Sequence, residues 1–278
     1  MNITTALQHA KQQIDRLDAE ALLAHVLEKD RSHFRAWPER EIEEQQLTQF
    51  QQLVTRRAKG EPLAYLTGWR EFWSLLLQVS PATLIPRPDT ETLVEQALEK
   101  IPADANWHIA DLGTGSGAIA LAIASERPNC NIVATDICPE ALKVAQTNAQ
   151  RLQLNNVEFR QGNWHEALKT DEQFQLITSN PPYIDAGDEH LKHDGLPHEP
   201  QQALSPGEDG LAAIRIIVEQ MKAHLCAPGW LLLEHGYNQG ISARELLSQQ
   251  SYTDVISHMD LGNNERVTQG RRTNQGTS

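Results

Sequence analysis

A glycine-rich turn between an apolar strand pattern and a small-residue helix pattern limits this chain to few folds. The run Ile109-Ala110-Asp111-Leu112 enters Gly113-Thr114-Gly115-Ser116-Gly117-Ala118, and small apolar residues follow from Ile119 to Ala124. Glycines let a backbone approach a ligand closely, and the first turn of a helix presents unpaired N–H groups. Strand, glycine turn and helix in this order are the context that a nucleotide-binding loop requires. The chain is therefore predicted to contain an open α/β sheet with a nucleotide-like ligand at this turn.

Two further strand patterns follow the glycine turn. The apolar run Ile132 to Thr135 ends at Asp136, about 20 residues beyond the glycines, where a carboxylate can accept hydrogen bonds from both hydroxyls of a ribose. Pro139 then opens a helix pattern, and a third strand pattern at 157–160 leads into Gly162-Asn163-Trp164. Asp136 is therefore a candidate ligand-binding residue.

The second motif with chemical consequences is Ser179-Asn180-Pro181-Pro182-Tyr183. It follows a buried strand pattern at 174–177, and its two prolines cannot extend a sheet because proline lacks an N–H and has a fixed φ. The chain therefore turns out at the carboxyl end of the strand, where open α/β sheets bind ligands. Asn180 offers an amide oxygen and two donors, the Pro181 carbonyl has no ladder partner, and Tyr183 adds a flat ring. These groups can hold a planar –NH2 conjugated to a carbonyl or a ring, and Asn-Pro-Pro-Tyr is the motif of methyltransferases that act on such nitrogens.

The glycine turn alone does not choose its cofactor. Gly113, Gly115 and Ala118 satisfy the G-x-G-x-x-G/A dinucleotide pattern, so a nicotinamide dehydrogenase is an alternative. Against it, the turn lies behind about 108 residues rather than near the start of a domain, and a dehydrogenase has no use for Asn-Pro-Pro-Tyr. Gly113, Gly115 and Gly117 also form the G-x-G-x-G loop of methyltransferases that use S-adenosylmethionine (AdoMet). AdoMet is therefore the expected cofactor.

The acidic charge of the chain is unevenly distributed. The net charge is −13, yet residues 1–72 carry 10 Lys and Arg against 11 Asp and Glu, and the remainder carries 14 against 26. Nucleic-acid binders usually show a basic stripe, so this acidic part disfavours a phosphate backbone as partner and suits a cationic cofactor or a basic protein. The charge also weakens a rival function, an adenine-N6 DNA or RNA methyltransferase that would use the same motif on an extruded base.

The cysteines and the apolar runs give expectations about the compartment. Three cysteines with no C-x-x-C pair argue against a disulfide framework and fit a reducing compartment. Residues 1–17 lack the apolar core of a signal peptide, and no apolar run approaches the roughly 20 residues that span a bilayer. We expect a cytoplasmic monomer that contacts neither membrane nor nucleic acid.

The chain is predicted to have two domains. In residues 1–72, apolar residues recur at helical spacing over 14–27 and again over 42–54, which predicts a small helical domain. Residues 73–88 change to alternating apolar residues and prolines, which indicates a β-hairpin or a linker. Residues 89–278 are expected to form the α/β domain. Asp89 or Thr90 is expected to cap its first helix.

Longer segments of the chain resemble the peptide chain release factor glutamine methyltransferases (the HemK/PrmC family). They are Glu61-Pro62-Leu63-Ala64-Tyr65-Leu66-Thr67-Gly68, Phe72-Trp73, Leu84-Ile85-Pro86-Arg87-Pro88-Asp89-Thr90-Glu91, Asp111 to Gly117, Ser179 to Ile184 and Glu265-Arg266-Val267. The Ile-Pro-Arg-Pro-Asp-Thr-Glu segment is the most family-specific, because the glycine turn and Asn-Pro-Pro-Tyr are shared more widely.

The resemblance implies a fold and a reaction. The implied fold is α/β, a class I AdoMet-dependent methyltransferase domain with a Rossmann-like seven-stranded sheet whose last strand is antiparallel. A small N-terminal helical domain would help to hold the release factor. The implied reaction is N5-methylation of the glutamine in the Gly-Gly-Gln loop of class I release factors, which supports translation termination and leaves S-adenosylhomocysteine.

The resemblance also implies site residues. On the cofactor side these are Asp111, Gly113, Thr114, Gly115, Ser116, Gly117, Asp136, Asn163, Trp164 and Asn180. Asp136 would hold the ribose, and Trp164 would flank the adenine. On the substrate side they are Asn180, Pro181, Pro182 and Tyr183, of which Asn180, Pro181 and Tyr183 are the implied catalytic residues. Two positions depart from the family, which commonly has Asp at Asn163 and an aromatic residue at His198.

Other charged residues allow more than one interpretation. The segment Asp185–Asp209 holds three histidines (His190, His193 and His198), seven carboxylates and one lysine. It is a solvated loop or an acidic lid over a basic substrate loop, and a metal site is disfavoured because the spacing matches no helix and no cysteine assists. Glu91 is either a first-turn helix residue or a cofactor-side contact, and Arg266 and Arg271 are most simply surface charges. A protein that retains AdoMet without catalysis is a further rival, which the intact Asn180 motif disfavours.

Overall fold

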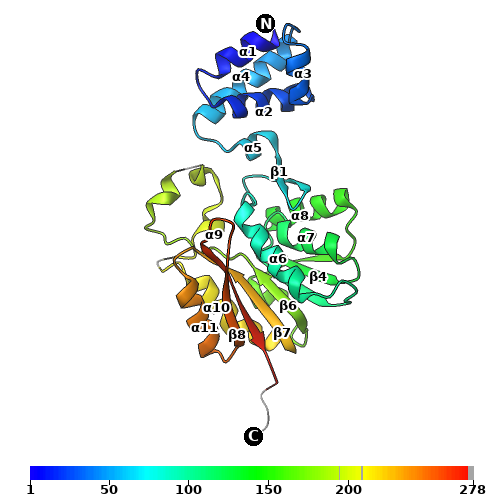
Figure 1. Ribbon diagram of the computed structural model, residues 1–278, viewed down its shortest axis with the longest axis vertical. Coiled ribbons are helices and arrows are strands. Elements are labelled where there is room, and N and C mark those ends of the chain that lie inside the picture. Colours follow the sequence, from blue (N-terminus) through cyan, green and yellow to red (C-terminus); the bar gives the residue numbers. More distant parts are fainter. Residues whose placement is uncertain (194, 208, 275–278) are drawn as a thin grey trace. The chain divides into compact units, whose positions relative to one another are not determined.

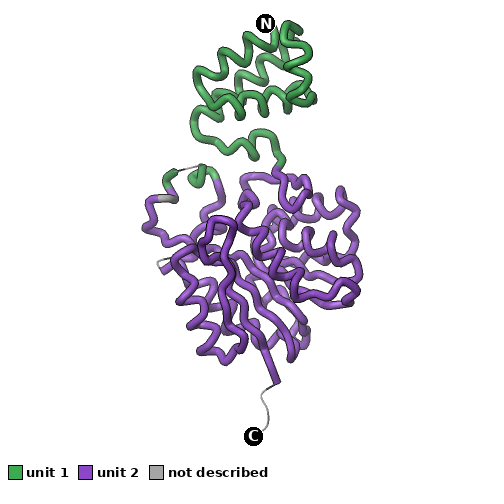
Figure 2. Tube along the Cα trace, in the orientation of Figure 1, with its two compact units in different colours: residues 1–69, 192–198 green, residues 70–191, 199–278 purple. Residues whose placement is uncertain are grey.

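The chain folds into two compact units. The structure is a computed structural model that describes residues 1–193, 195–207 and 209–274. One unit consists of residues 1–69 and 192–198, and the other of residues 70–191 and 199–278 (Figure 2). The smaller unit therefore ends earlier than the expected boundary at residue 72. It also includes a distant segment that no local sequence pattern indicated.

The smaller unit is helical. Its helices are α1 (Ile3–Ala10), α2 (Arg16–Leu27), α3 (Arg31–Ala36), α4 (Glu44–Ala58) and α5 (Leu63–Thr67). Ile3, Leu22, Leu23 and Phe50 are buried in its core, which burial of apolar surface stabilises. The predicted helices at 14–27 and 42–54 are confirmed as α2 and α4, although Ile14 and Ile42 precede them. Helices α3 and α5 are too short to repeat an apolar period and were not predicted. Helix α1 was not predicted either, although Ile3, Ala6, Leu7 and Ala10 follow the helical spacing and are buried.

The larger unit is built on a seven-stranded sheet. Its strands are β3 (His108–Leu112), β4 (Asn131–Asp136), β5 (Val157–Gln161), β6 (Phe174–Ser179), β7 (Leu225–Glu234), β8 (Thr253–Met259) and β9 (Glu265–Arg272). Their order is β5-β4-β3-β6-β7-β9-β8, and β9 is antiparallel to both of its neighbours. The predicted seven-stranded sheet with an antiparallel last strand is confirmed.

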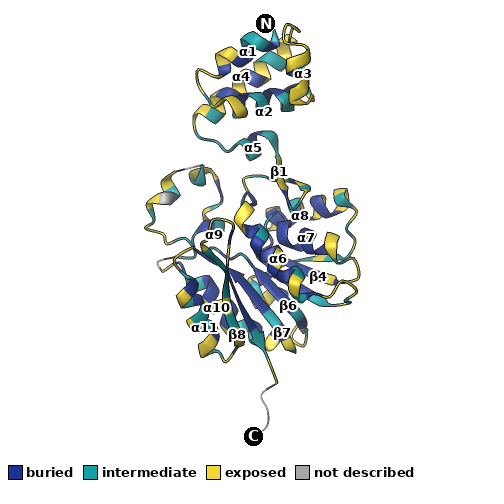
Figure 3. Cartoon of the chain, in the orientation of Figure 1, coloured by how far each residue is buried: buried dark blue, intermediate teal, exposed yellow. Residues whose placement is uncertain are grey.

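Helices cover both faces of this sheet (Figures 1 and 3). On one face pack α6 (Glu91–Lys100), α7 (Ala118–Glu126) and α8 (Pro139–Leu152), and on the other α10 (Ala212–Met221) and α11 (Gly240–Gln249). Successive strand residues alternate between the two layers, so Ile109 lies in the first core and Ala110 in the second. Where both faces are buried, the inner strands carry apolar runs such as Ile132 to Ala134 in β4 and Leu231 to Leu233 in β7, whereas the edge strands β5 and β8 carry exposed polar residues.

The remaining elements are short. They are the hairpin strands β1 (Trp69–Phe72) and β2 (Leu75–Gln78), helix α9 (Gln201–Leu204), and the 3-10 turns η1 (Pro88–Thr90), η2 (Trp164–Ala167), η3 (Glu189–Lys192), η4 (Leu196–His198) and η5 (Lys222–His224). The hairpin begins before the expected segment 73–88. None of the helices in the described ranges is both long and apolar enough to cross a membrane.

The strand order places a switch point between β3 and β6. From β3 the chain proceeds outward through β4 to β5, and then returns to β6 on the opposite side of β3. Leu112, the last residue of β3, pairs with Ser179, the last residue of β6. The glycine turn and the Asn-Pro-Pro-Tyr motif therefore leave the sheet side by side. In open α/β sheets this point is the usual ligand-binding crevice.

Candidate functional site

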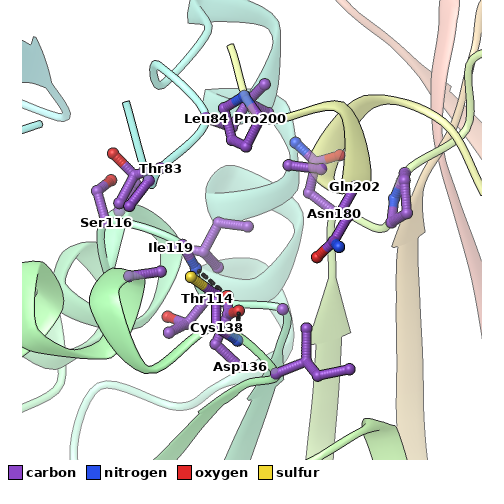
Figure 4. Close-up of a pocket in the computed structure, with 18 of the residues that line it drawn as sticks. Thr83, Leu84, Thr114, Ser116, Ile119, Asp136, Cys138, Asn180, Pro200 and Gln202 are labelled. Carbon is purple, nitrogen blue, oxygen red and sulfur yellow. Dashed lines mark hydrogen bonds between the residues drawn. The ribbon is translucent and has the colours of Figure 1, made fainter. Parts of the chain in front are cut away.

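A cleft opens at the carboxyl ends of β3, β4, β5 and β6. Its lining includes, from these strand ends, Gly113, Thr114, Gly115, Ser116, Asp136, Ile137, Cys138, Gly162, Asn163, Trp164, Asn180 and Pro182. Figure 4 shows Thr114, Asp136 and Asn180 around one open space, with Leu84 and Pro200 at its rim. The structure thus brings together most of the residues predicted from the two motifs.

The three glycines of the turn have different roles. All have positive φ, at +72° for Gly113, +57° for Gly115 and +86° for Gly117. A Cβ on Gly115 would meet nothing within 4 Å, so a ligand can reach this backbone directly. A Cβ on Gly117 would instead lie 3.0 Å from Leu121 Cδ1 and 3.2 Å from Ala145 Cβ. Gly117 does not line the cleft, and it permits close packing of α7 and α8.

Asp111 lies beneath the turn and does not line the cleft. Its side chain is 1% exposed and accepts hydrogen bonds from the Thr114 hydroxyl at 2.6 Å and the Thr178 hydroxyl at 3.1 Å. Burial raises the pKa of Asp111 to about 6, against the two hydroxyl donors, which lower it. Asp111 therefore orders the glycine turn from below.

Asp136 lines the cleft and also organises its floor. Its carboxylate accepts the Gly115 N–H at 2.8 Å and the Cys138 N–H at 2.9 Å. Burial raises its pKa, and these backbone donors oppose the rise. A carboxylate has about four lone-pair sites, so two remain for hydroxyl groups of a ligand. The next residue, Ile137, is 56% exposed, which gives the same region an apolar surface.

Asn163 and Trp164 reach the cleft from the end of β5. The Trp164 ring is packed against Gly113, since a Cβ on that glycine would lie 3.4 Å from Trp164 Cζ3. Asn163 is exposed, and its side chain forms no hydrogen bond with the described residues. The ring and the amide are thus available to an aromatic, polar ligand.

The Asn-Pro-Pro-Tyr residues divide between the cleft and the protein interior. Asn180 and Pro182 line the cleft, whereas Pro181 is buried. The Asn180 amide donates from Nδ2 to Thr90 Oγ1 at 3.2 Å, and its Oδ1 accepts no hydrogen bond from the described residues. The Tyr183 hydroxyl donates to Glu234 Oε1 at 3.2 Å, and burial raises its pKa. The Tyr183 ring is therefore not part of the cleft lining, although its neighbours Asn180 and Pro182 are.

Two segments that local patterns did not indicate complete the cleft. Ala82 to Arg87 contribute from the expected linker, and Pro200 to Ala203 from the acidic segment 185–209. They are held together by Glu199, which is buried, forms an ion pair with Arg87 and accepts the Ile85 N–H at 3.0 Å. The only sequence signal for this arrangement was the family-specific proline segment.

Of three charged residues interpreted from the sequence, only Arg266 differs, whereas Arg271 and Glu91 fit an interpretation given for them. Arg266 is not a surface charge, because its side chain is 11% exposed and pairs with Asp260 at 3.1 Å and Asp89 at 3.2 Å. Arg271 is partly exposed and lies 3.4 Å from Asp254. Glu91 is the first residue of α6 and accepts the Trp73 N–H at 2.9 Å, away from the cleft.

The predicted cap of α6 also differs. Thr90 occupies the N-cap position, but no side chain caps the helix, because the Thr90 hydroxyl faces Asn180.

The acidic segment 185–209 is described only in part. Asp194, Glu208 and the His190 side chain lie outside the described residues. Among the residues that are described, no three His, Cys, Asp or Glu side chains converge as a metal site requires. Glu199 is bound within the larger unit, so it is not a solvated loop charge.

Comparisons with known proteins agree with this geometry. A family model of the PrmC N-terminal domain matches residues 2–68, and one of a methyltransferase domain matches residues 103–258. The release factor glutamine methyltransferase of Escherichia coli K12 is 51% identical over 256 residues, covering 92% of both chains. That of Vibrio cholerae is 47% identical over 268 residues, covering 96% of this chain and 93% of the relative.

Solved structures show the same fold at lower identity. A methyltransferase from Pyrococcus furiosus is similar over 79% of this chain and 97% of its own, with a TM-score of 0.54 and 17% identity. A 16S rRNA N2 methyltransferase from Thermus thermophilus, solved with AdoMet and guanosine, is similar over 73% of this chain and 49% of its own, with a TM-score of 0.55 and 17% identity.

Fold, cleft and matched domain define a class I methyltransferase that uses AdoMet. The identity of about half the residues to the release factor glutamine methyltransferases, over nearly the whole chain, identifies its family. The chain belongs to the release factor glutamine methyltransferase family.

Proposed function

We propose that this protein transfers a methyl group from AdoMet to the N5 side-chain amide of the glutamine in the Gly-Gly-Gln loop of class I release factors. The observation that carries the proposal is the Asn180 amide, which stands at the switch point beside the glycine turn and whose Oδ1 accepts no hydrogen bond from the described residues. The relatives' shared name supports the choice of substrate.

The residues of the cleft fit the cofactor. Gly115 leaves open space where any other residue would place a Cβ, so the backbone can contact the ligand closely. Asp136 retains acceptor sites for the ribose hydroxyls, and Trp164 with Ile137 offers apolar surface for the adenine. The Asn163 amide can hydrogen-bond the adenine edge, where the family commonly has Asp. Thr114 and Ser116 also line the cleft, whereas Asp111 and Gly117 support the glycine turn without lining it.

The chain's own groups can orient the glutamine amide. Asn180 Oδ1 and the Pro181 carbonyl both lack a hydrogen-bond partner within the described residues, so each can accept one N–H of the –NH2 group. An amide nitrogen is a poor nucleophile because its lone pair is delocalised into the carbonyl. Two acceptors that fix its N–H groups would also stabilise positive charge as it develops on nitrogen.

The proton requires no dedicated base before transfer. Bound AdoMet supplies an electrophilic methyl group. The amide proton becomes acidic only when the nitrogen is alkylated, and it then leaves that nitrogen to solvent when the methylated product is released. Pro182 lines the cleft and helps to keep water from the amide, and Tyr183 anchors the motif through Glu234.

The working environment follows from the proposed substrate. We infer a cytoplasmic monomer that contacts its release factor and no nucleic acid directly. The three cysteines, Cys130, Cys138 and Cys226, are all free, which suits a reducing compartment. The helical residues 2–68 are expected to help hold the release factor, and the segment 185–209 is a candidate acidic lid.

Intact-mass analysis tests the proposal. A class I release factor incubated with the protein and AdoMet should gain one methyl group. The gain should vanish when the Gly-Gly-Gln glutamine is replaced, and its initial rate should fall about tenfold or more when Asn180→Ala is used. Adenine-containing DNA and RNA serve as parallel substrates. Methylation of nucleic acid alone would favour the adenine-N6 alternative, and AdoMet binding without turnover on any substrate would favour a binding protein.

A further inference from the structure

One side chain joins three backbone segments where the Asn-Pro-Pro-Tyr motif ends. Gln239 lies in the turn between β7 and α11 and is partly buried. Its Nε2 donates to the Tyr183 carbonyl at 2.9 Å and to the Gly210 carbonyl at 3.3 Å. Its Oε1 accepts the Gly236 N–H at 2.9 Å. Both donor hydrogens of the amide and one acceptor site of its oxygen are therefore used.

These bonds fix the direction in which the Gln239 amide faces. Two carbonyls lie against its nitrogen and one N–H lies against its oxygen, so a half-turn of the amide would set oxygen against oxygen and donor against donor. The Gln239 N–H also donates to the Gly236 carbonyl at 2.9 Å, which ties the residue to its own turn a second time. The amide is therefore held in one orientation.

The residue at position 210 must lack a side chain for this arrangement. Gly210 has a φ of +62°, and a Cβ there would lie 2.7 Å from the Tyr183 oxygen and 2.8 Å from Gln239 Nε2. Both distances are shorter than van der Waals contact. The approach of two carbonyls to one –NH2 group therefore depends on glycine at this position.

The Tyr183 carbonyl is stiffly connected to Asn180. Pro181 and Pro182 separate the two residues, and the ring of each proline fixes its φ at about −65°. Asn180 directly follows β6, so the sheet holds the motif at its start, and Gln239 holds it at its end. A shift of the Tyr183 carbonyl is therefore transmitted to the Asn180 side chain.

The backbone after the motif also carries part of the cleft wall. The Ile184 N–H donates to the Leu204 carbonyl at 2.9 Å, and the Ala186 N–H donates to the Gly207 carbonyl at 3.2 Å. Residues 200–203, which contribute to the cleft lining, immediately precede Leu204. A shift of the backbone after the motif therefore reaches this wall as well.

We propose that Gln239 is a positioning residue, which acts through the Tyr183 carbonyl to hold Asn180 and the adjoining cleft wall in the geometry that methyl transfer requires. This inference rests on the proposed function and deepens it. The residues proposed to hold AdoMet at the glycine turn and at Asp136 follow β3 and end β4, whereas Gln239 bonds the segments that follow β6 and β7. Loss of the Gln239 amide should therefore impair methyl transfer and leave AdoMet binding nearly unchanged.

Two variants at this position test the contact. Gln239→Glu keeps an acceptor for the Gly236 N–H but sets a carboxylate oxygen against the two carbonyls. Gln239→Leu removes all three side-chain bonds. With release factor and AdoMet, each variant should lower kcat about tenfold or more, the size of an orientation effect. The Kd of AdoMet, measured by titration calorimetry, should change less than about threefold.

The matched control is Gln249→Glu, which makes the same change of charge at the last residue of α11. Gln249 is exposed, so this variant should keep the wild-type kcat and the wild-type affinity for AdoMet. The proposal is overturned by a kcat within about twofold of wild type for Gln239→Leu, or by an equal loss of kcat in Gln249→Glu. It is also overturned if Gln239→Leu loses as much AdoMet affinity as kcat, because a general structural role would damage both.

Backbone amide exchange, followed by NMR, measures the contact itself. The N–H groups of Ile184 and Ala186 should exchange at least about tenfold faster in both Gln239 variants than in wild type and in Gln249→Glu. The Gly236 N–H should exchange faster only in Gln239→Leu, because Gln239→Glu retains an acceptor for it.

The exchange measurement needs no substrate. If wild-type protein methylates no release factor, the proposed function fails, and the exchange rates alone then decide whether Gln239 holds the end of the motif. Equal exchange of the Ile184 N–H in wild type and in both Gln239 variants overturns the positioning role whatever the activity.

Discussion

Alanine at Gly115 and alanine at Gly117 should differ in which property they damage more, the stability of the fold or the affinity for AdoMet. Gly115→Ala and Gly117→Ala each force a non-glycine residue to positive φ, at +57° and +86°. That conformation costs an L-residue about 1–2 kcal/mol. At Gly115 no steric clash adds to this conformational cost, because no atom lies within 4 Å of the new Cβ. We therefore expect Gly115→Ala to lose about 1–2 kcal/mol of unfolding free energy.

At Gly117 the new methyl also meets the protein. It would lie 3.0 Å from Leu121 Cδ1 and 3.2 Å from Ala145 Cβ, so α7 and α8 must shift. Overpacking of this kind costs about 1–3 kcal/mol, which brings the expected loss for Gly117→Ala to about 2–5 kcal/mol. The same methyl points away from the cleft, so AdoMet affinity should change less than about threefold, or 0.7 kcal/mol.

For AdoMet affinity, Gly115→Ala should be the more damaging of the two substitutions. The Gly115 methyl enters the space that a ligand needs beside the backbone, and AdoMet affinity should fall about tenfold or more, or 1.4 kcal/mol. Denaturant unfolding and titration calorimetry with AdoMet measure the two quantities on the same samples. The reasoning is refuted if Gly117→Ala loses more affinity than Gly115→Ala, or if Gly115→Ala is the less stable protein.

Three further predictions concern buried polar groups. Asn180→Ala should keep no more than about a tenth of the methylation rate, measured as initial rates on release factor, since orientation and charge stabilisation are each worth about tenfold or more; a higher residual rate contradicts the assigned role. In the fold, Asp111 keeps its proton up to about pH 6, whereas in the unfolded chain it loses the proton near pH 4. The free energy of unfolding should therefore fall by up to about 3 kcal/mol as pH rises between these two values. Asp111→Asn should abolish that fall in urea unfolding at pH 4.5 and 7.5, and parallel pH profiles for the two proteins would disprove it. Arg266→Met removes a charge that lowers the pKa of Glu234, so the carboxyl should titrate at higher pH by 13C NMR, and an unchanged midpoint would show that Arg266 does not act on it.

Much of the fold could be predicted because its signals are local. The glycine turn, the acidic residue at the end of β4 and the proline pair after β6 each depend on backbone geometry within a few residues. Helices α2 and α4 are long enough to show their apolar period. Short helices such as α3 and α5 were not predicted, because fewer than two turns cannot repeat an apolar period.

Other parts of the site depend on residues that are distant in sequence. The Glu199 carboxylate joins residues 85 and 87 to the segment after 199, although more than a hundred positions separate them. Arg266 appeared to be an ordinary surface charge in sequence, yet it pairs with buried Asp260. Burial is a property of the packed chain, so composition and spacing did not reveal either contact.

By itself, the sequence indicated which groups we assign to the chemistry: the flexible glycines, Asp136 as the proposed ribose acceptor and the Asn180 amide follow from residue identity and local turns. Only the tertiary structure decided how these groups act together. The pairing of Leu112 with Ser179 brings the two motifs to one edge of the sheet. Burial raises the pKa of Asp111 and Glu234, because water is excluded from carboxyls that would be ordinary acids in the unfolded chain. Such effects arise from the packing of distant segments, which is why they are absent from the sequence patterns.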